Sequence, residues 1–222
     1  MSEIGLYEAM ASTRAVRRLR PDPIPDAVLR RVFEAATWAP SGGNRQPWRV
    51  IAVREPAIKR TFGELYQGPW APYSSRQRAQ LARLPAESRS RGERALAAGD
   101  YLAAHLHEVP VIAVFCFQPE LLMITDAALP RPSVVGGASI YPAVENLLLA
   151  CRAEGLGCVL TTLLCIAEEQ IRPLLRIPDP WATAAFVPIG YPIGRGHSPV
   201  SRKPVAEMAF ADRWDSPLFD AV

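Results

Sequence analysis

The segment from Val109 to Phe117 constrains the fold more than any other part of the chain, because it is apolar and carries no charged residue. A strand with one wet face alternates between apolar and polar residues, whereas this run is suited to burial on both faces. It therefore predicts a strand inside the core, covered on two sides. At 222 residues and 49% hydrophobic, the chain is long enough to supply the covering layers within one domain, residues 1–222.

Helical and strand periods are mixed along the rest of the chain. Apolar spacing predicts helices at about 3–11, 25–38, 57–65, 96–107, 140–154 and 167–175, and strands at about 48–53, 157–162 and 183–189. The helix at 140–154 is the most strongly marked, since Pro142 suits its first turn and Gly155 suits a left-handed stop. This mixture indicates an α+β fold.

Residues 66–95 interrupt the pattern with six arginines, several serines and prolines, and little periodicity. We expect a mobile insertion or lid here. Its first aromatic residues, Tyr66, Trp70 and Tyr73, are candidates for stacking on a planar substrate, and local packing of a loop is an equally good interpretation.

Bulk properties narrow the class of protein. The formal charge of +3 comes from 25 basic and 22 acidic residues spread along the chain, which argues against a nucleic-acid-binding face, although a nucleic-acid binder using the arginines at 76–94 remains an alternative. No segment approaches the roughly 18 apolar residues that cross a bilayer. Four cysteines without CxxC spacing, Cys116, Cys151, Cys158 and Cys165, indicate reduced thiols and no metal site. We expect a cytoplasmic protein without a membrane partner.

Two basic segments are candidates for binding a phosphate. The first, Arg14-Ala15-Val16-Arg17, follows the first helix, and the second, Ser201-Arg202-Lys203-Pro204, lies near the other end of the chain. Guanidinium groups bind phosphate through paired hydrogen bonds, so the two segments would converge on one group. The alternative is that each is a solvated turn.

Two further segments have the composition of a ligand site. The loop from Pro40 to Trp48 contains two glycines, which permit close backbone approach, and the amides of Asn44 and Gln46, which suit the pyrimidine edge of a flavin. The segment from Gly155 to Leu163 is a strand that ends in Thr161 and Thr162, at the kind of position where ligands bind. The alternatives are an ordinary turn and an ordinary buried strand.

These segments, in this order and separation, resemble the FMN-dependent nitroreductase family, which includes flavin reductases, nitroreductases, halotyrosine dehalogenases and flavin-fragmenting synthases. The resemblance covers most of the chain. It implies a sandwich in which a central, mostly antiparallel sheet is flanked by helices, within an intertwined homodimer that holds two FMN groups at the subunit interface. The loop from Pro40 to Trp48 would then approach the FMN bound mainly by the other protomer.

The resemblance also implies which residues contact FMN: Arg14, Ala15, Val16, Arg17, Pro40, Ser41, Gly42, Asn44, Gln46, Thr161, Thr162, Leu163 and Arg202. Arg14 and Arg202 would hold the phosphate, and Arg17 would place positive charge near N1 and O2 of the ring. The family often has Ser or Thr where this chain has Ala15, so a hydroxyl contact is missing and the backbone must replace it. The acidic, tyrosine and lysine lid residues of halotyrosine dehalogenases have no counterpart in 66–95.

The implied activity is hydride transfer from NADH or NADPH to a small planar acceptor, such as a nitroaromatic or a quinone, by a ping-pong mechanism. FMN carries out this chemistry, so we assign no catalytic residue in the protein. Alternatives are reductive dehalogenation, alkene reduction or flavin fragmentation on the same fold, and a non-enzymatic FMN-binding module.

Overall fold

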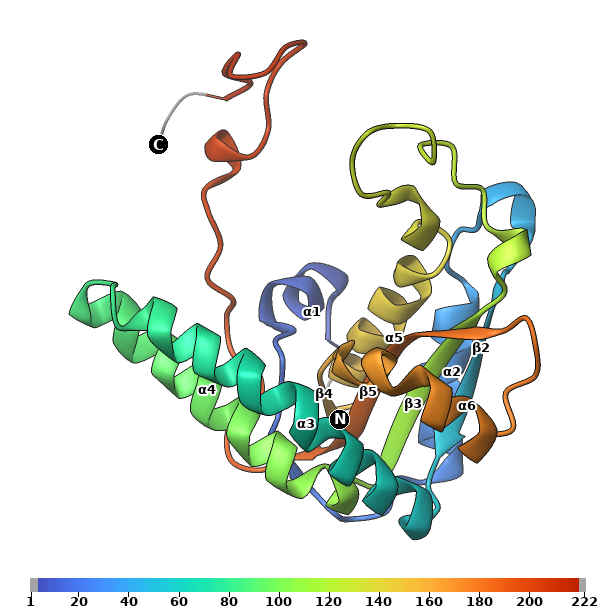
Figure 1. Ribbon diagram of the computed structural model, residues 1–222. Coiled ribbons are helices and arrows are strands. Elements are labelled where there is room, and N and C mark those ends of the chain that lie inside the picture. The colour runs from blue at the N-terminus through green and yellow to red at the C-terminus, as the bar shows by residue number, and fades with distance from the viewer. Residues whose placement is uncertain (1–3, 220–222) are drawn as a thin grey trace.

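The computed structural model describes residues 4–219, which form a sheet between two helical layers (Figure 1). The sheet contains β2 (Trp48–Val53), β3 (Val111–Phe117) and β5 (Ala182–Pro192), together with the short strands β1 (Leu19–Arg20) and β4 (Gly157–Cys158). Its order is β2-β3-β5-β1, with β4 also pairing with β5, and each of these pairings is antiparallel. The predicted α+β sandwich with a mostly antiparallel sheet is confirmed.

Strand β3 is buried on both faces, as its apolar run predicts. Val111, Ala113 and Phe115 pack into one core, whereas Ile112 and Val114 point into a second core on the opposite face. This alternation follows from the two-residue period of a strand. Each face therefore needs its own helical cover.

Different helices cover the two faces. The first core includes residues of α2 (Asp26–Thr37) and α5 (Tyr141–Ala153), and α1 (Leu6–Ser12) contacts α5. The second core includes residues of α3 (Pro56–Leu81), α4 (Ala86–His105) and α6 (Glu168–Leu174). The helix predicted at 140–154 is confirmed: Pro142 lies in its first turn, and Gly155 has a φ of 73° directly after its last turn.

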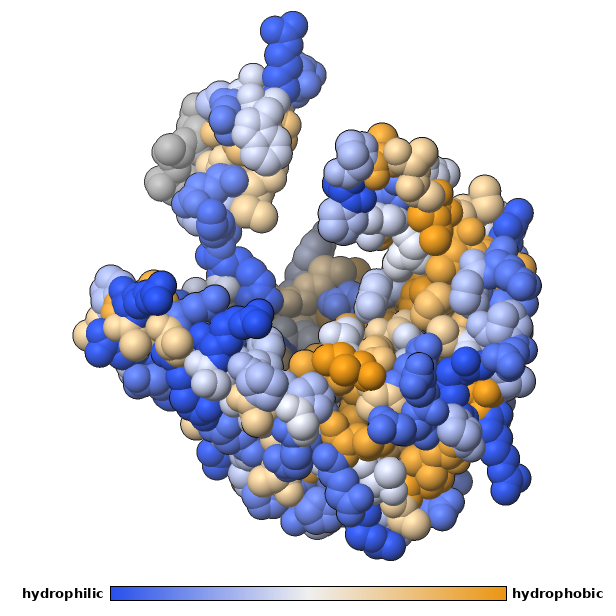
Figure 2. All heavy atoms as spheres, viewed as in Figure 1, coloured by the Kyte–Doolittle hydropathy of each residue, from blue (hydrophilic) through white to orange (hydrophobic). Residues whose placement is uncertain are grey.

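The predicted irregular segment at 66–95 is wrong. Helix α3 continues through Pro69 and Pro72 to Leu81, and α4 begins at Ala86, so the two helices form a long hairpin (Figure 1). Arginine and serine side chains give the hairpin the hydrophilic surface seen in Figure 2. The polar composition that predicted a loop therefore belongs to a helical hairpin whose outer faces are exposed to solvent.

One other expectation needs correction. The strand expected at 157–162 pairs with β5 only at Gly157 and Cys158, and Thr161 forms an isolated bridge with Phe186. The C-terminal segment after β5 passes behind the hairpin in the view of Figure 1 and then runs away from the body of the molecule. Within residues 4–219, no helix combines the length and apolar character needed to cross a membrane.

Candidate functional site

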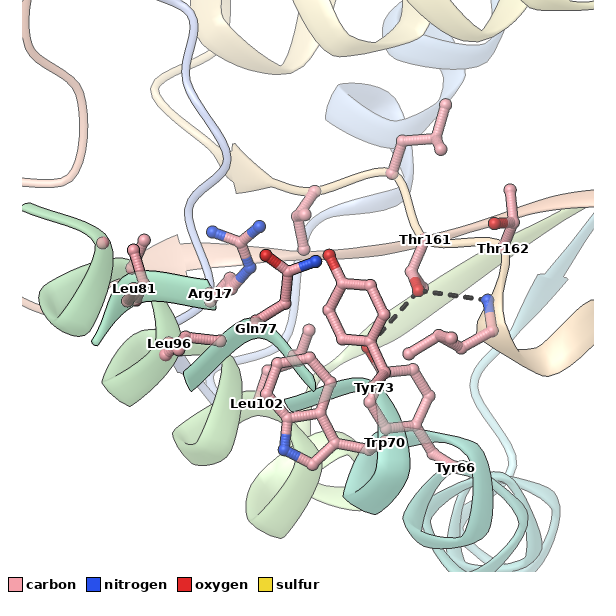
Figure 3. Close-up of a pocket in the computed structure, with 15 residues that line it drawn as sticks. Arg17, Tyr66, Trp70, Tyr73, Gln77, Leu81, Leu96, Leu102, Thr161 and Thr162 are labelled. Atoms are coloured by element: carbon pink, nitrogen blue, oxygen red, sulfur yellow. Dashed lines mark hydrogen bonds between the residues drawn. The ribbon is translucent and has the colours of Figure 1, made fainter. Parts of the chain in front are cut away.

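A cavity of about 340 Å³ lies between the helical hairpin and the strand layer (Figure 3). Arg17 lines it from the loop before β1, and residues 159–163 line it from the segment after β4. The hairpin supplies the opposite wall, through Tyr66, Trp70, Tyr73, Gln77, Leu81, Gly92, Ala95, Leu96 and Leu102. The structure thus brings two of the predicted segments together, although they are far apart in the sequence.

Backbone contacts hold these two segments side by side. The Val16 amide donates a hydrogen bond of 2.9 Å to the Cys158 carbonyl, and Val16 itself is buried. Gly157 lies so close that a Cβ there would stand 2.7 Å from Cγ1 of Val16. A glycine is therefore needed at 157 because the Arg17 loop packs directly on its backbone.

Arg17 is the cation of the cavity. Its side chain is half-buried, and burial lowers the pKa of its guanidinium from the ordinary value, although Tyr66 and Tyr73 raise it in part. No carboxylate within residues 4–219 forms an ion pair with Arg17, although ion pairs engage many other arginines of the chain. A guanidinium stays charged even when it is partly buried, so this cavity is suited to an anion or to an electron-rich edge of a ligand.

The segment after β4 supplies hydroxyl groups on the same side. The Thr161 amide donates to the Phe186 carbonyl and the Phe186 amide donates to the Thr161 carbonyl, each at 2.9 Å. The Thr161 hydroxyl lies 3.3 Å from the Tyr66 hydroxyl and accepts a hydrogen bond of 3.4 Å from the Leu163 amide (Figure 3). Thr161, Thr162 and Leu163 all line the cavity, where the resemblance implies that they lie along a flavin.

The hairpin wall contains a signal that the sequence analysis missed. Tyr66, Trp70, Tyr73 and Gln77 are spaced by four, three and four residues, so they share one face of α3 and all line the cavity. Pro69 and Pro72 concealed this spacing, because prolines are expected to end a helix. Gln77, Leu81 and Leu96 were therefore not recognised as candidates.

The other basic residues lie apart from the cavity walls. Arg14 is exposed and donates a hydrogen bond of 2.7 Å to the Ser198 hydroxyl, and Ala15 is exposed beside it. Arg202 is exposed and donates a hydrogen bond of 2.9 Å to the neighbouring Ser201 carbonyl. Arg14 thus contacts the segment that follows β5, Arg202 belongs to that segment, and the roles of both at a phosphate stay predictions.

The loop at 40–46 lies elsewhere in this chain. Pro40, Ser41 and Gly42 line a separate cavity of about 400 Å³, whose other walls come from residues 122–139. The Gln46 side-chain amide donates to the Asn44 side-chain oxygen at 3.0 Å, and the Gln46 backbone amide donates to the Ser41 hydroxyl at 2.8 Å. Among the described residues, none of this loop lines the Arg17 cavity, so its role at a ligand there stays a prediction.

The chain is similar to known proteins over most of its length. Residues 10–191 match the model of the Nitroreductase family. A protein of Thermus thermophilus named NADH dehydrogenase is 34% identical over 210 residues, which cover 90% of this chain and 92% of that protein. A 5,6-dimethylbenzimidazole synthase of Rhodobacter capsulatus is 29% identical over 214 residues, covering 95% of both chains.

A solved structure supports the same relationship at the level of the fold. A nitroreductase of Desulfitobacterium hafniense with bound FMN superimposes with a TM-score of 0.61 at 20% identity, covering 93% of this chain and 97% of that chain. The names of these relatives support an oxidoreductase, and the family match spans the loop of Arg17, the loop at 40–46 and the segment around Thr161. The chain therefore belongs to the nitroreductase family.

Proposed function

We propose that this protein is an FMN-dependent oxidoreductase that passes hydride from NADH or NADPH to a small planar organic acceptor. The observation that carries the proposal is the half-buried guanidinium of Arg17, which has no acidic partner among residues 4–219 and faces an aromatic helix surface across a cavity. A flavin combines a flat ring, hydrogen-bonding edges and an anionic phosphate, so it matches this combination.

The residues present fit FMN. Arg17 offers positive charge, Thr161 and Thr162 offer hydroxyl groups, and Gly157 allows the Arg17 loop to pack against the strand layer. Bound FMN supplies the hydride-transfer chemistry, for which side chains alone have no equivalent. The chain's own residues orient the ring, stabilise negative charge at the Arg17 edge and exclude water, while Arg14 and Arg202 hold the phosphate. No protein nucleophile is needed.

The functional unit is proposed to be a homodimer. A groove of about 580 Å³ between α1, α2 and α5 is bordered by Leu6 and Trp38, which are 62% and 73% exposed. The C-terminal segment carries Trp214, which is 84% exposed. Large apolar surfaces of this kind are typical of a subunit interface. In the dimer, the loop with Pro40, Ser41, Gly42, Asn44 and Gln46 approaches the FMN of the partner.

The hairpin is proposed to act as a lid over the acceptor, within a single domain of residues 1–222. The cavity beside Arg17 joins the proposed flavin residues to the aromatic wall, so donor and acceptor would use it in turn. Such alternation gives ping-pong kinetics, seen as parallel double-reciprocal lines. Intersecting lines would argue against it. The cytoplasm, where nicotinamide donors are abundant, is the proposed location.

An anaerobic visible spectrum tests the proposal directly. Purified protein is expected to carry FMN, to lose its yellow colour on addition of NADH or NADPH, and to regain it on addition of a quinone or a nitroaromatic compound. Protein that cannot be reconstituted with FMN would refute the proposal. Bound FMN that no nicotinamide reduces would point to a binding module or to another electron donor.

The synthase relative supports one alternative, in which the same fold carries out other flavin chemistry. Product analysis of the reduced protein mixed with oxygen distinguishes the two. Intact FMN after many turnovers supports the oxidoreductase, and loss of flavin with formation of a benzimidazole supports fragmentation.

A further inference from the structure

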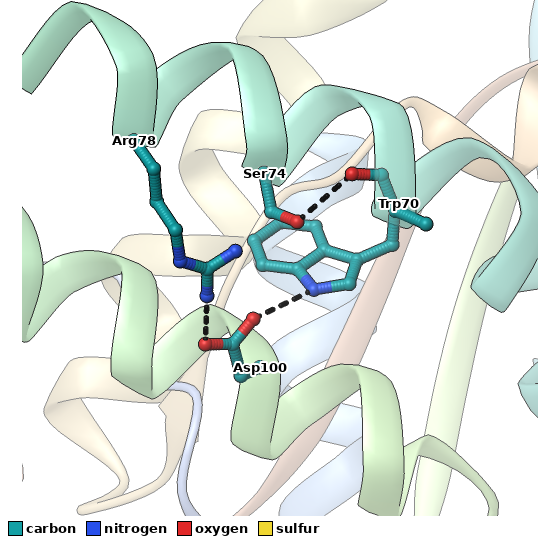
Figure 4. Close-up of polar contacts among 5 residues, drawn as sticks. Trp70, Ser74, Arg78 and Asp100 are labelled. Carbon is teal, nitrogen blue, oxygen red and sulfur yellow. Dashed lines mark hydrogen bonds and ion pairs between the residues drawn. The ribbon is translucent and has the colours of Figure 1, made fainter.

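The indole ring of Trp70 packs against two consecutive residues of α4, Gly99 and Asp100. A Cβ at Gly99 would lie 2.3 Å from Cη2 and 2.7 Å from Cζ2 of Trp70, so only glycine leaves room for the ring there. The next residue, Asp100, accepts a hydrogen bond of 3.0 Å from the indole N–H (Figure 4). One residue thus provides the space, and the other provides the hydrogen-bond acceptor.

A third residue, Arg78, holds the Asp100 carboxylate in place. Arg78 of α3 donates a hydrogen bond to the other carboxylate oxygen of Asp100, so the carboxylate bridges Arg78 and Trp70 (Figure 4). An indole N–H can only donate, so a carboxylate oriented in this way determines which way the ring faces. Asp100 does not line the Arg17 cavity, and any effect on a ligand there acts through Trp70.

Trp70 in turn organises the aromatic wall of that cavity. Its ring stacks with Tyr66 at 6.1 Å between centroids and an angle of 18°, and contacts Tyr73 at 5.5 Å and 38°. Tyr73 is 45% exposed and, like Trp70, lines the cavity (Figure 3). A shift of the indole would therefore move the neighbouring rings as well.

The carboxylate also affects the electronic character of the wall. An N–H that donates to an anionic acceptor is polarised, which adds electron density to the indole ring and strengthens the negative potential of its face. Electron-rich faces attract cationic or electron-poor partners. A planar ligand with electron-withdrawing groups therefore gains more from this wall than an electron-rich ligand of the same shape.

We propose that Gly99 and Asp100 are positioning residues that fix the indole of Trp70, and that the Asp100 carboxylate makes the cavity selective for electron-poor planar aromatic compounds. This inference rests on the proposed function, since it names the class of acceptor that the same cavity admits. It concerns residues of the hairpin, and none of them is among the predicted FMN contacts.

The test compares 4-nitrobenzoate with 4-methylbenzoate, which share a carboxylate and a similar outline and differ in electron demand. Binding of each compound to the oxidised protein, without a nicotinamide donor, is measured by titration calorimetry. Asp100→Asn keeps an oxygen that accepts the indole N–H but removes the charge, and it is expected to lower the preference for the nitro compound about 3- to 5-fold, within the range of a weak aromatic interaction. Asp100→Ala also removes the acceptor that holds the Trp70 indole, and it is expected to weaken the binding of both compounds.

Two controls separate this role from general charge and folding effects. Glu93 is an exposed carboxylate on α4 that forms no ion pair with any of residues 4–219, so Glu93→Gln removes the same charge and is expected to leave the preference unchanged. In a Trp70→Phe background, Asp100→Asn is expected to have no further effect on the preference, because the indole N–H is gone. Thermal unfolding verifies that each variant is folded.

A preference that Asp100→Asn leaves intact would overturn the electronic part of the inference, and full binding by Asp100→Ala would overturn the positioning part. Flavin content and bleaching by NADH and by NADPH are measured on the same samples. Failure of those two readouts would count against the proposed function, whereas the ligand preference reports on the wall itself.

Discussion

The two sides of the Arg17 cavity are built in different ways. The strand side, residues 16–19 and 157–163, is held by backbone hydrogen bonds: Val16 pairs with Cys158, and Thr161 pairs with Phe186. The hairpin side, residues 66–102, lines the cavity through side chains of two helices. These side chains pack where Gly92 leaves room for Leu81 and Gly99 leaves room for Trp70, and Trp70 also donates a hydrogen bond to Asp100.

This difference separates two tasks. Backbone pairing uses main-chain groups that nearly every residue carries, so the strand side is suited to a cofactor that must always be bound in one way. Side-chain packing between helices changes with single substitutions, so the hairpin side is suited to selecting among acceptors. Variants on the strand side should therefore affect the cofactor, and variants on the hairpin should affect the acceptor.

The largest effect is expected from Arg17→Ala. It removes the cation of the strand side, and one charge-assisted hydrogen bond is worth about 1.5–3 kcal/mol, so FMN affinity should fall about 10- to 100-fold. Fluorescence titration of the apo-protein with FMN measures this change. The rate of flavin reduction by NADH should fall as well.

Arg18→Ala is the matched control for Arg17→Ala. Arg18 is exposed and lies over the Tyr101 ring, 4.9 Å from its centroid, so its loss should change FMN affinity less than about 3-fold. Equal losses in the two variants would mean that net charge, and not the placement of Arg17, controls cofactor binding.

A smaller effect is expected from Gly157→Ala. The new Cβ would meet Cγ1 of Val16 at 2.7 Å and Cδ2 of Leu19 at 2.9 Å, inside a region held by backbone pairing. Overpacking of this kind costs about 1–3 kcal/mol of unfolding free energy, which urea denaturation measures, and it should also weaken FMN binding by displacing Arg17.

Gly68→Ala serves as the reference, since Gly68 lies in α3 and a Cβ at this position would have no neighbouring atom within 4 Å. It should be neutral or stabilising by up to about 1 kcal/mol. If Gly157→Ala were as stable as Gly68→Ala, the strand side would be more adaptable than its backbone contacts indicate.

The smallest effect is expected from Gly92→Ala on the hairpin. The new Cβ would approach Cδ2 of Leu81 at 2.2 Å, but this is the end of a flexible side chain that can rotate. The gain in helix propensity of about 1 kcal/mol should offset the repacking cost, leaving stability nearly unchanged. Because Leu81 lines the cavity, the KM for an acceptor should change a few-fold while FMN affinity stays the same. A parallel loss of FMN affinity would show that the two sides are coupled.

Sequence reasoning succeeded where the physical signal is local. The two-face burial of Val111–Phe117 follows from its composition, and the ends of α5 follow from Pro142 and Gly155. It failed at 66–95, because Pro69 and Pro72 indicate a break in an isolated helix, whereas in the folded chain α3 continues through them and packs along α4. Tertiary contacts with a neighbouring helix outweighed the local preference.

The sequence by itself determined the sheet with two buried faces, the strongest helix, the family and the segments that carry Arg17 and Thr161. These features depend on periodicity and on residue types at short spacing, which a linear chain displays directly. Only the tertiary structure decided that Arg17 faces Trp70 across one cavity, that the loop at 40–46 lies apart from it, and that Gly99 and Asp100 seat the indole. Those relations join residues distant in the sequence, and they arise only when α3 packs on α4 and the hairpin packs on the sheet.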